Sequence, residues 1–217
     1  AAAQGRKVAR GNTTDLRIGY AGAYELWTIV SQIRKYRRLH PEAEFEFTLG
    51  SNRSLLNDLA SGQLDMAVLS GFGMELGKGL DSRVTLSDPC EVMISSAHPL
   101  AEKKVINPRD LKGIPIVLNR AQDTQPSAGQ IAGMYANMGL SENKRMYADD
   151  FYSIALIINT GIAFSIMPAS IVHWGIEGVV FRPIQGFKAK ARTLLVYPRG
   201  SQDPGIQSFV SLVKPKY

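Results

Sequence analysis

The chain has 217 residues, of which 45% are hydrophobic, so it is long enough for one or two domains with a sizeable core. Its 25 Lys and Arg outnumber its 19 Asp and Glu, but the resulting charge of +6 is dispersed rather than gathered in a nucleic-acid-binding run. No apolar run approaches the ~18 residues of a membrane span, and residues 1–14 lack the apolar segment of a signal peptide, so we expect a cytoplasmic protein.

Residues 16–70 predict one β-α-β-α-β unit. The expected strands are Leu16–Tyr20, Phe45–Leu49 and Met66–Ser70, and the expected helices run from about Tyr24 to His40 and from Arg53 to Ser61. This order requires a parallel sheet with helices on its faces. Small molecules bind such sheets at the carboxyl ends of the strands, near helix N-termini. Here those ends are small or hydrogen-bonding: Ala21-Gly22-Ala23, Gly50-Ser51-Asn52 and Gly71-Phe72-Gly73.

The first expected helix is amphipathic. Its apolar residues repeat at helical spacing and should face the sheet: Leu26, Ile29, Val30 and Ile33. Its basic residues lie on the opposite face: Arg34, Lys35, Arg37 and Arg38. We interpret this basic group as a solvated face, with a phosphate-binding footprint as the alternative.

The residues that commonly bind metals or form disulfides are sparse. The one cysteine, Cys90, has no partner in the chain, and we interpret it as a half-buried small residue, with a redox sensor as the alternative. The histidines, His40, His98 and His173, have no second ligand at metal-binding spacing. We therefore expect neither a metal nor a cofactor.

A second α/β unit is expected in residues 90–189. Pro89 separates the short strands Val84–Ser87 and Glu91–Ser95, because it has no N–H for a central ladder, and this break is a candidate first crossing between domains. Asp149 or Asp150 should cap a helix that Gly161 ends. The remaining expected elements are strands at Ile114–Leu118, about Lys144–Tyr147 and Ala163–Met167, and a helix from about Ser127 to Met138.

The last strand and helix should return to the first domain. Thr193–Tyr197 and the amphipathic helix around Phe209 cannot bury themselves alone, so they need a sheet that has already formed. The chain then divides into 1–15 as a linker, 16–89 plus 190–217 as subdomain I, and 90–189 as subdomain II. The predicted fold class is α/β, with two Rossmann-like subdomains joined by two crossover strands. Paired connections of this kind make a hinge around an interdomain cleft.

Several motifs then occur in a familiar order. The first are Leu16-Arg-Ile-Gly19, a helix ending at His40-Pro41, and Leu59-Ala-Ser-Gly-Gln-Leu-Asp-Met-Ala-Val68. The later ones are His98-Pro-Leu-Ala101, Asp110-Leu-Lys-Gly-Ile-Pro115 and Gly161-Ile-Ala-Phe-Ser-Ile-Met-Pro168. Over about Leu16–Val213 the chain resembles the effector-binding domain of LysR-type transcriptional regulators.

The resemblance implies a sensor of periplasmic-binding-protein type II-like fold that binds a small, often anionic, metabolite between its subdomains. Family members bind promoter DNA through an N-terminal winged helix-turn-helix, which this chain starts too late to include; residues 1–11 look like the end of the linker helix. They also form homodimers or homotetramers, side by side through the region that corresponds to Glu25–Leu49. We expect the same partners here.

By position, the resemblance places the effector against loops of both subdomains. The implied ligand-binding residues are Gly22, Ala23, Tyr24, Ser51, Asn52, Arg53 and Phe72 in the first, and Asn119, Arg120, Asp149, Phe151, Thr160 and Gly161 in the second. Ala23-Tyr24 departs from the serine or threonine that often opens the first helix in the family.

Each of these residues has a structural alternative. Ser51 and Asn52 are also ordinary helix N-caps, and Arg53 is also a typical solvated side chain. Single aromatic residues are more often core or rim residues than pocket walls. For Asp65 we expect a local hydrogen bond rather than a ligand contact.

Other classes of protein are less consistent with the sequence. It has no Gly-x-Ser-x-Gly and no phosphate-cradling loop, and capping explains Asp149-Asp150 better than acid–base chemistry, so we do not expect an enzyme. The runner-up is an exported periplasmic solute-binding protein for transport, which would share this architecture. A co-repressor-like interaction domain without a ligand is a third possibility.

Overall fold

The computed structural model describes residues 14–71, 74, 76–120 and 128–214, and these divide into two compact units. Unit 1 contains residues 14–71, 76–87 and 192–214, and unit 2 contains residue 74 and residues 88–191 apart from 121–127. The chain passes between the units inside strand β4 (Leu80–Ser95) and returns inside strand β9 (Lys190–Pro198). No helix in the described ranges combines the length and apolar character needed to cross a membrane.

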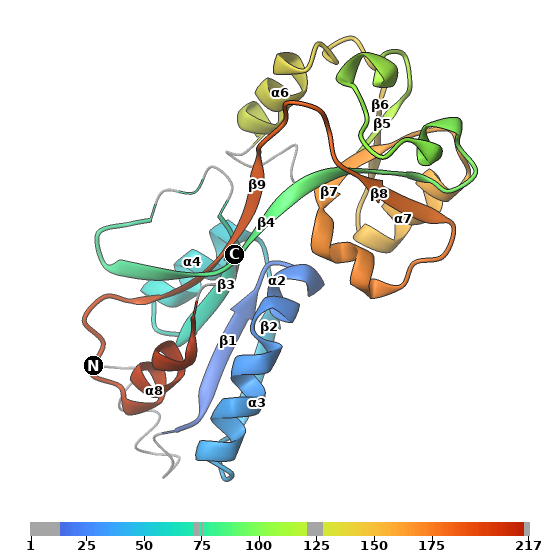
Figure 1. Ribbon diagram of the computed structural model, residues 1–217. Helices are drawn as coiled ribbons and strands as arrows, with labels where there is room; N and C mark the ends of the chain where they lie inside the picture. The colour runs from blue at the N-terminus through green and yellow to red at the C-terminus, as the bar shows by residue number, and fades with distance from the viewer. Residues whose placement is uncertain (1–13, 72–73, 75, 121–127, 215–217) are drawn as a thin grey trace. The chain divides into compact units, whose positions relative to one another are not determined.

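Unit 1 is built on the predicted parallel sheet. Strand β1 (Leu16–Tyr20) pairs in parallel with β2 (Phe45–Leu49) on one side and with β3 (Met66–Ser70) on the other, as Figure 1 shows. Strand β9 extends the sheet antiparallel to β3, with Val68 opposite Leu195. Strand β2 lies at the edge of the sheet. The three predicted strands and their order are confirmed.

The prediction of one long first helix is wrong, because the segment forms two helices, α2 (Ala23–Thr28) and α3 (Val30–Leu39). The hydroxyl of Thr28 donates to the carbonyl oxygen of Glu25 at 2.7 Å, and Ile29 then leaves the helical region with φ −109° and ψ 2°. A threonine hydroxyl that bonds a carbonyl in its own helix competes with the helical ladder. The basic group on α3 is exposed, as predicted.

The hydrophobic core of unit 1 contains residues from both the early and the late part of the sequence. Helix α8 (Pro204–Leu212) contributes Phe209 to a cluster that also holds Tyr36 of α3 and Leu16 of β1. The Tyr36 and Phe209 rings lie 5.6 Å apart. The predicted return of the last strand and helix to the opening domain is therefore confirmed. Helix α4 (Asn52–Ala60) buries Leu55 and Leu59.

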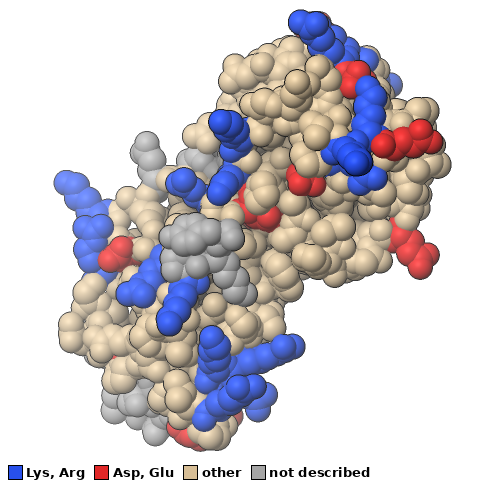
Figure 2. Space-filling view, in the orientation of Figure 1, with Lys and Arg blue, Asp and Glu red and all other residues tan. Residues whose placement is uncertain are grey.

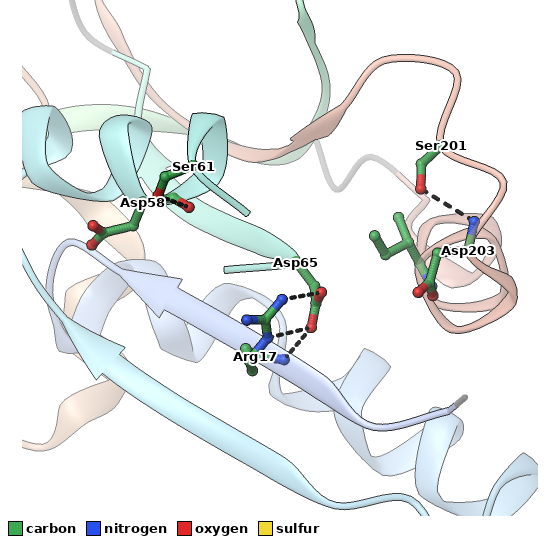
Figure 3. Close-up of polar contacts among 7 residues, drawn as sticks. Arg17, Asp58, Ser61, Asp65, Ser201 and Asp203 are labelled. Atoms are coloured by element: carbon green, nitrogen blue, oxygen red, sulfur yellow. Dashed lines mark hydrogen bonds and ion pairs between the residues drawn. The ribbon is translucent and has the colours of Figure 1, made fainter. Parts of the chain in front are cut away.

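An ion pair ties the start of β1 to the start of β3 (Figure 3). Arg17 Nη2 lies 2.9 Å from Asp65 Oδ1, and both Nε and the backbone N–H of Arg17 donate to Asp65 Oδ2, at 3.2 and 2.8 Å. The Asp65 N–H donates in turn to the Arg17 carbonyl at 2.9 Å. Asp65 thus makes a structural contact as predicted, but its partner is 48 residues away rather than local.

The predicted break at Pro89 is wrong, since β4 runs through it as one strand. The ladder between β4 and β7 (Ser165–Pro168) begins only at Cys90, opposite Pro168, so Pro89 lies where that side of β4 has no ladder to interrupt. On the other side the Cys90 N–H donates to the Ala189 carbonyl at 3.0 Å. A proline is tolerated at such a position.

Unit 2 holds a second set of parallel strands. Strand β5 (Ile116–Asn119) pairs in parallel with β6 (Arg145–Ala148), and Ile116 also bridges to Phe164 just before β7. Strand β8 (Val179–Arg182), which was not predicted, pairs antiparallel with β4. The helices are α6 (Ala128–Asn137) and α7 (Phe151–Asn159), with short 3₁₀ helices η1 (Pro99–Glu102), η2 (Pro108–Leu111) and η3 (Ala169–Trp174).

Candidate functional site

Backbone and side-chain hydrogen bonds hold the three parallel strand ends of unit 1 together. The Gly50 N–H after β2 donates to the Tyr20 carbonyl of β1 at 3.2 Å, and the Ala21 N–H after β1 donates to the Val68 carbonyl of β3 at 3.1 Å. The Asn52 side-chain amide then donates to the Ser70 carbonyl at 3.3 Å. The loops that follow the strands therefore lie side by side, as the parallel sheet requires.

The N-terminus of α4 carries three of the predicted residues. The Ser51 hydroxyl accepts a hydrogen bond from the Ser54 N–H at 3.1 Å, which confirms its capping role. Asn52 Oδ1 is buried and has no hydrogen-bond partner among the described residues. A buried polar atom without a partner costs about 1–3 kcal/mol. Arg53 is exposed and makes no ion pair with any described residue.

The N-terminus of α2 is different, because it already faces a carboxyl group. A Cβ on Gly22, the N-cap residue, would lie 2.8 Å from Glu25 Oε2. Burial raises the pKa of the Glu25 carboxyl. Tyr24 stacks on Trp27 with ring centroids 6.2 Å apart, and Ala23 is exposed. The Glu25 carboxyl already occupies this N-terminus, so α4 has the more open N-terminus for an anion.

The predicted residues of unit 2 that follow β5 and β6 are brought together. Arg120 Nε lies 2.9 Å from Asp149 Oδ1, and the Asn119 side-chain amide donates to the Asp149 carbonyl at 3.4 Å. The Arg120 guanidinium also lies 5.7 Å from the centroid of the Tyr147 ring. Arg120 and Asp149 are both exposed, at 60% and 78% of their side-chain surface. Water or a ligand can therefore reach this pair.

Helix α7 separates the other predicted residues of unit 2. Asp150 caps it by accepting from the Ser153 N–H at 3.0 Å and the Ser153 hydroxyl at 2.6 Å, and these bonds lower the pKa of Asp150. Phe151 begins the helix near Asp149. Thr160 and Gly161 end it, and nine residues at 1.5 Å place them about 13 Å away. They do not join Asn119, Arg120 and Asp149.

Some residues at these loops were not found by sequence reasoning. Glu25 was not singled out, although an acidic residue in a first helical turn is a common helix-stabilising signal. Trp174, whose ring packs edge-on against Phe151 at 5.3 Å, comes from η3 and carried no local signal. Phe72 lies outside the described residues.

The described residues offer no metal-binding cluster. The described residues include no group of three His, Cys, Asp or Glu side chains that could hold a metal ion. On the face drawn in Figure 2, Lys and Arg side chains lie in several separate groups, with uncharged residues between the groups. Cys90 is half-buried, as predicted.

The chain is similar to known protein sequences over most of its length. Residues 9–217 match the family model of the LysR substrate binding domain. The transcriptional regulator AlsR of Bacillus subtilis (strain 168) is 22% identical over 208 residues, which are 95% of this chain and 68% of that protein. The regulator YnfL of Escherichia coli (strain K12), described as uncharacterized, is 25% identical over 211 residues, 96% of this chain and 70% of that protein.

Solved structures with the same fold have low sequence identity. The BenM effector binding domain with its effector benzoate has a TM-score of 0.78 at 16% identity, covering 92% of this chain and 90% of that one. The effector binding domain of QuiR in complex with shikimate has a TM-score of 0.75 at 18% identity, covering 92% and 94%. Full-length CbnR complexed with its target DNA has a TM-score of 0.80 at 18% identity, covering 98% and 74%. With a periplasmic-binding-protein type II-like fold and a family match over nearly its whole length, the chain belongs to the LysR substrate-binding domains, the ligand-sensing regulatory domains of LysR-type transcriptional regulators.

Proposed function

We propose that the chain senses a small carboxylate-bearing metabolite through the strand-end loops of its two units and thereby regulates transcription. The observation that carries this proposal is the N-terminus of α4. There Ser51 caps the helix, Asn52 presents a buried acceptor without a partner among the described residues, and the Arg53 cation is free of ion pairs with them. A helix N-terminus also offers free N–H groups and about half a positive charge.

The chemistry of the α4 N-terminus suits a carboxylic acid that also carries a hydroxyl group. Free backbone N–H groups and Arg53 attract a carboxylate, while Asn52 Oδ1 requires a hydrogen-bond donor. Benzoate, bound by BenM, supplies only the carboxylate, whereas shikimate, bound by QuiR, supplies both groups. We therefore rank hydroxylated carboxylic acids above plain aromatic acids for this chain.

In unit 2 the Arg120–Asp149 pair is the corresponding anchor. An effector carboxylate can replace Asp149 as the partner of Arg120, because both side chains are exposed and an exposed ion pair is worth only about 0–1 kcal/mol. Phe151 lies one helical turn or less from this pair and supplies an apolar contact. Gly22, Ala23 and Tyr24 are proposed to contribute backbone and ring contacts. The cleft predicted between the subdomains stays a prediction, as does the role of Thr160 and Gly161.

The related transcriptional regulators support further proposals about activity, location, DNA and oligomeric state. They are transcriptional regulators, so we propose that this chain is not an enzyme and that it acts in the cytoplasm on promoter DNA. We also propose an oligomer. Strand β2 is a sheet edge with apolar side chains, and Phe47 and Leu49 are 44% and 64% exposed. Sheet edges of this kind need covering. The exported transport protein has no support among the relatives described above.

The direct test is a thermal-shift screen of small carboxylic acids that includes shikimate and benzoate. A ligand at a hundred times its dissociation constant adds about 2.7 kcal/mol of stability. The double variant Ser51→Ala, Arg53→Ala should remove the shift. The matched control, Ser61→Ala with Arg38→Ala, changes the same residue types at the other end of α4 and on α3, and should keep it. A shift that survives in the first variant would refute the placement of the site.

A further inference from the structure

Three buried threonines from three different elements contact one another inside unit 1. Thr28 ends α2, Thr85 lies on β4 and Thr193 lies on β9, and they are 2%, 0% and 1% exposed. The Thr28 hydroxyl contacts the Glu25 carbonyl oxygen at 2.7 Å and the Thr85 hydroxyl at 2.9 Å. The Thr85 hydroxyl also contacts the Thr193 carbonyl oxygen at 3.1 Å. These contacts form a relay, the threonine relay, that runs from α2 through β4 to β9.

The hydroxyl protons of the threonine relay are fewer than its contacts. A threonine hydroxyl has one proton to donate, whereas a carbonyl oxygen only accepts. The Thr28 and Thr85 hydroxyls therefore supply two protons to three oxygen–oxygen contacts. One of the contacts must lack a proton at any moment.

Two arrangements of the protons meet this condition at the lowest cost. If the contact between the two hydroxyls lacked a proton, two buried oxygen atoms would face each other at 2.9 Å, which is unfavourable away from water. In the first remaining arrangement, Thr28 donates to Thr85, and Thr85 donates to the Thr193 carbonyl. In the second, Thr85 donates to Thr28, and Thr28 donates to the Glu25 carbonyl. The hydrogen bond at one end of the relay is therefore made when the bond at the other end is lost.

The two ends of the threonine relay have different positions in the domain. At one end, α2 begins after its N-cap Gly22, among the residues proposed to contact the effector. At the other end, Thr193 is the second residue of unit 1 after β9 returns from unit 2, and its own hydroxyl oxygen is buried without a partner among the described residues. Thr85 lies three residues before Asp88, where β4 enters unit 2. The relay thus joins α2 to both strands that connect the units.

We propose that the threonine relay is a two-state switch, in which the protons of Thr28 and Thr85 point together toward α2 or together toward β9. Each arrangement strengthens the hydrogen bonding of one element and weakens that of the other, so a change in α2 shifts the hydrogen bonding of β9. Control of the switch by an effector rests on the proposed function. The switch itself depends only on atoms of unit 1, and its test needs no effector.

Hydrogen exchange of the full chain tests the switch. Thr28→Val removes one hydroxyl, so the Thr85 proton has only the Thr193 carbonyl to bond. A proton that two acceptors shared equally then stays on β9, and amide exchange in Thr193–Tyr197 should slow about twofold. Loss of a merely structural contact of α2 would instead speed this exchange, so the sign of the change separates the two roles.

Matched variants isolate the hydroxyl groups. Thr28→Ser keeps the hydroxyl and should leave exchange in β9 unchanged, and Thr28→Ala takes the place of Thr28→Val if valine prevents folding. Thr85→Val removes the donor to β9 and should speed the exchange, and adding Thr28→Val to it should cause no slowing. Strand β5 (Ile116–Asn119) of unit 2 is the internal reference and should exchange at the same rate in every variant.

Unchanged or faster exchange in β9 after removal of the Thr28 hydroxyl would overturn the proposal, and so would a slowing that persists without the Thr85 hydroxyl. The effector site is tested separately. The Ser51→Ala, Arg53→Ala variant should lose the carboxylate response and exchange like the parent in β9, so a failure of the proposed effector site is distinguishable from a failure of the switch.

Discussion

Replacing Asp65 with asparagine should destabilise unit 1 by about 2–3 kcal/mol. The Asp65 side chain is 5% exposed and that of Arg17 is 18% exposed, so the pair is largely out of water. Breaking a buried pair costs about 3–5 kcal/mol. The one amide oxygen of asparagine can still accept the two bonds that Arg17 donates to Oδ2, and Arg17 keeps some contact with water, which lowers the expected cost.

The chain provides a separate reporter for each unit. Its two tryptophans are Trp27 in unit 1 and Trp174 in unit 2, so urea unfolding of Asp65→Asn in a Trp174→Phe background follows unit 1 alone. Asp149→Asn in unit 2, followed through Trp174 in a Trp27→Phe background, is the matched control, because it breaks an exposed pair with Arg120 and should cost less than about 1 kcal/mol. A cost below about 0.5 kcal/mol for Asp65→Asn, at the level of ordinary surface substitutions, would refute the reasoning.

Three further outcomes are expected. The double variant Phe47→Lys, Leu49→Lys should lower the sedimentation coefficient of the protein at high concentration, because charge on the exposed β2 edge opposes association. An unchanged coefficient would exclude this edge as the interface between copies of the chain. Burial raises the pKa of Cys90 to about 11, so its reaction with a thiol reagent should be slower than that of free cysteine at pH 8 and should accelerate toward pH 11. Burial also raises the pKa of Glu25, so ionising this group lowers the stability of the protein once the pH rises above the unfolded-state pKa of the group. In urea unfolding, Glu25→Gln should therefore be more stable than the parent at pH 8 and should lose that advantage near pH 4.

The errors in predicting the fold occurred where a distant contact decided a local outcome. Residues 24–40 contain no glycine or proline that would predict a break at Ile29, and the Thr28 hydroxyl beside the break contacts Thr85 at 2.9 Å, 57 residues away. Pro89 was expected to end a strand. It is accommodated because the β7 ladder starts one residue later, and that register is set by residues 165–168.

The candidate site was predictable only in part for a related reason. Ser51 and Asp150 act as caps within four residues of their own position, so their roles follow from local sequence. The Arg120–Asp149 pair and the contact of Asn52 with Ser70 join residues 29 and 18 positions apart, so they depend on the tertiary structure. Strand β8, which pairs with β4, carried no clear signal in the sequence.

The sequence by itself determined the class of fold, the parallel order of β1, β2 and β3, and the family, because hydrophobic periodicity, turn residues and motifs are properties of neighbouring residues. Only the tertiary structure decided that Asp65 pairs with Arg17, that Glu25 occupies one helix N-terminus while α4 leaves another open, and that Arg182 donates to the Ala101 carbonyl. These facts depend on which side of a strand or helix meets which neighbour. Long-range packing fixes that choice, and no local pattern encodes it.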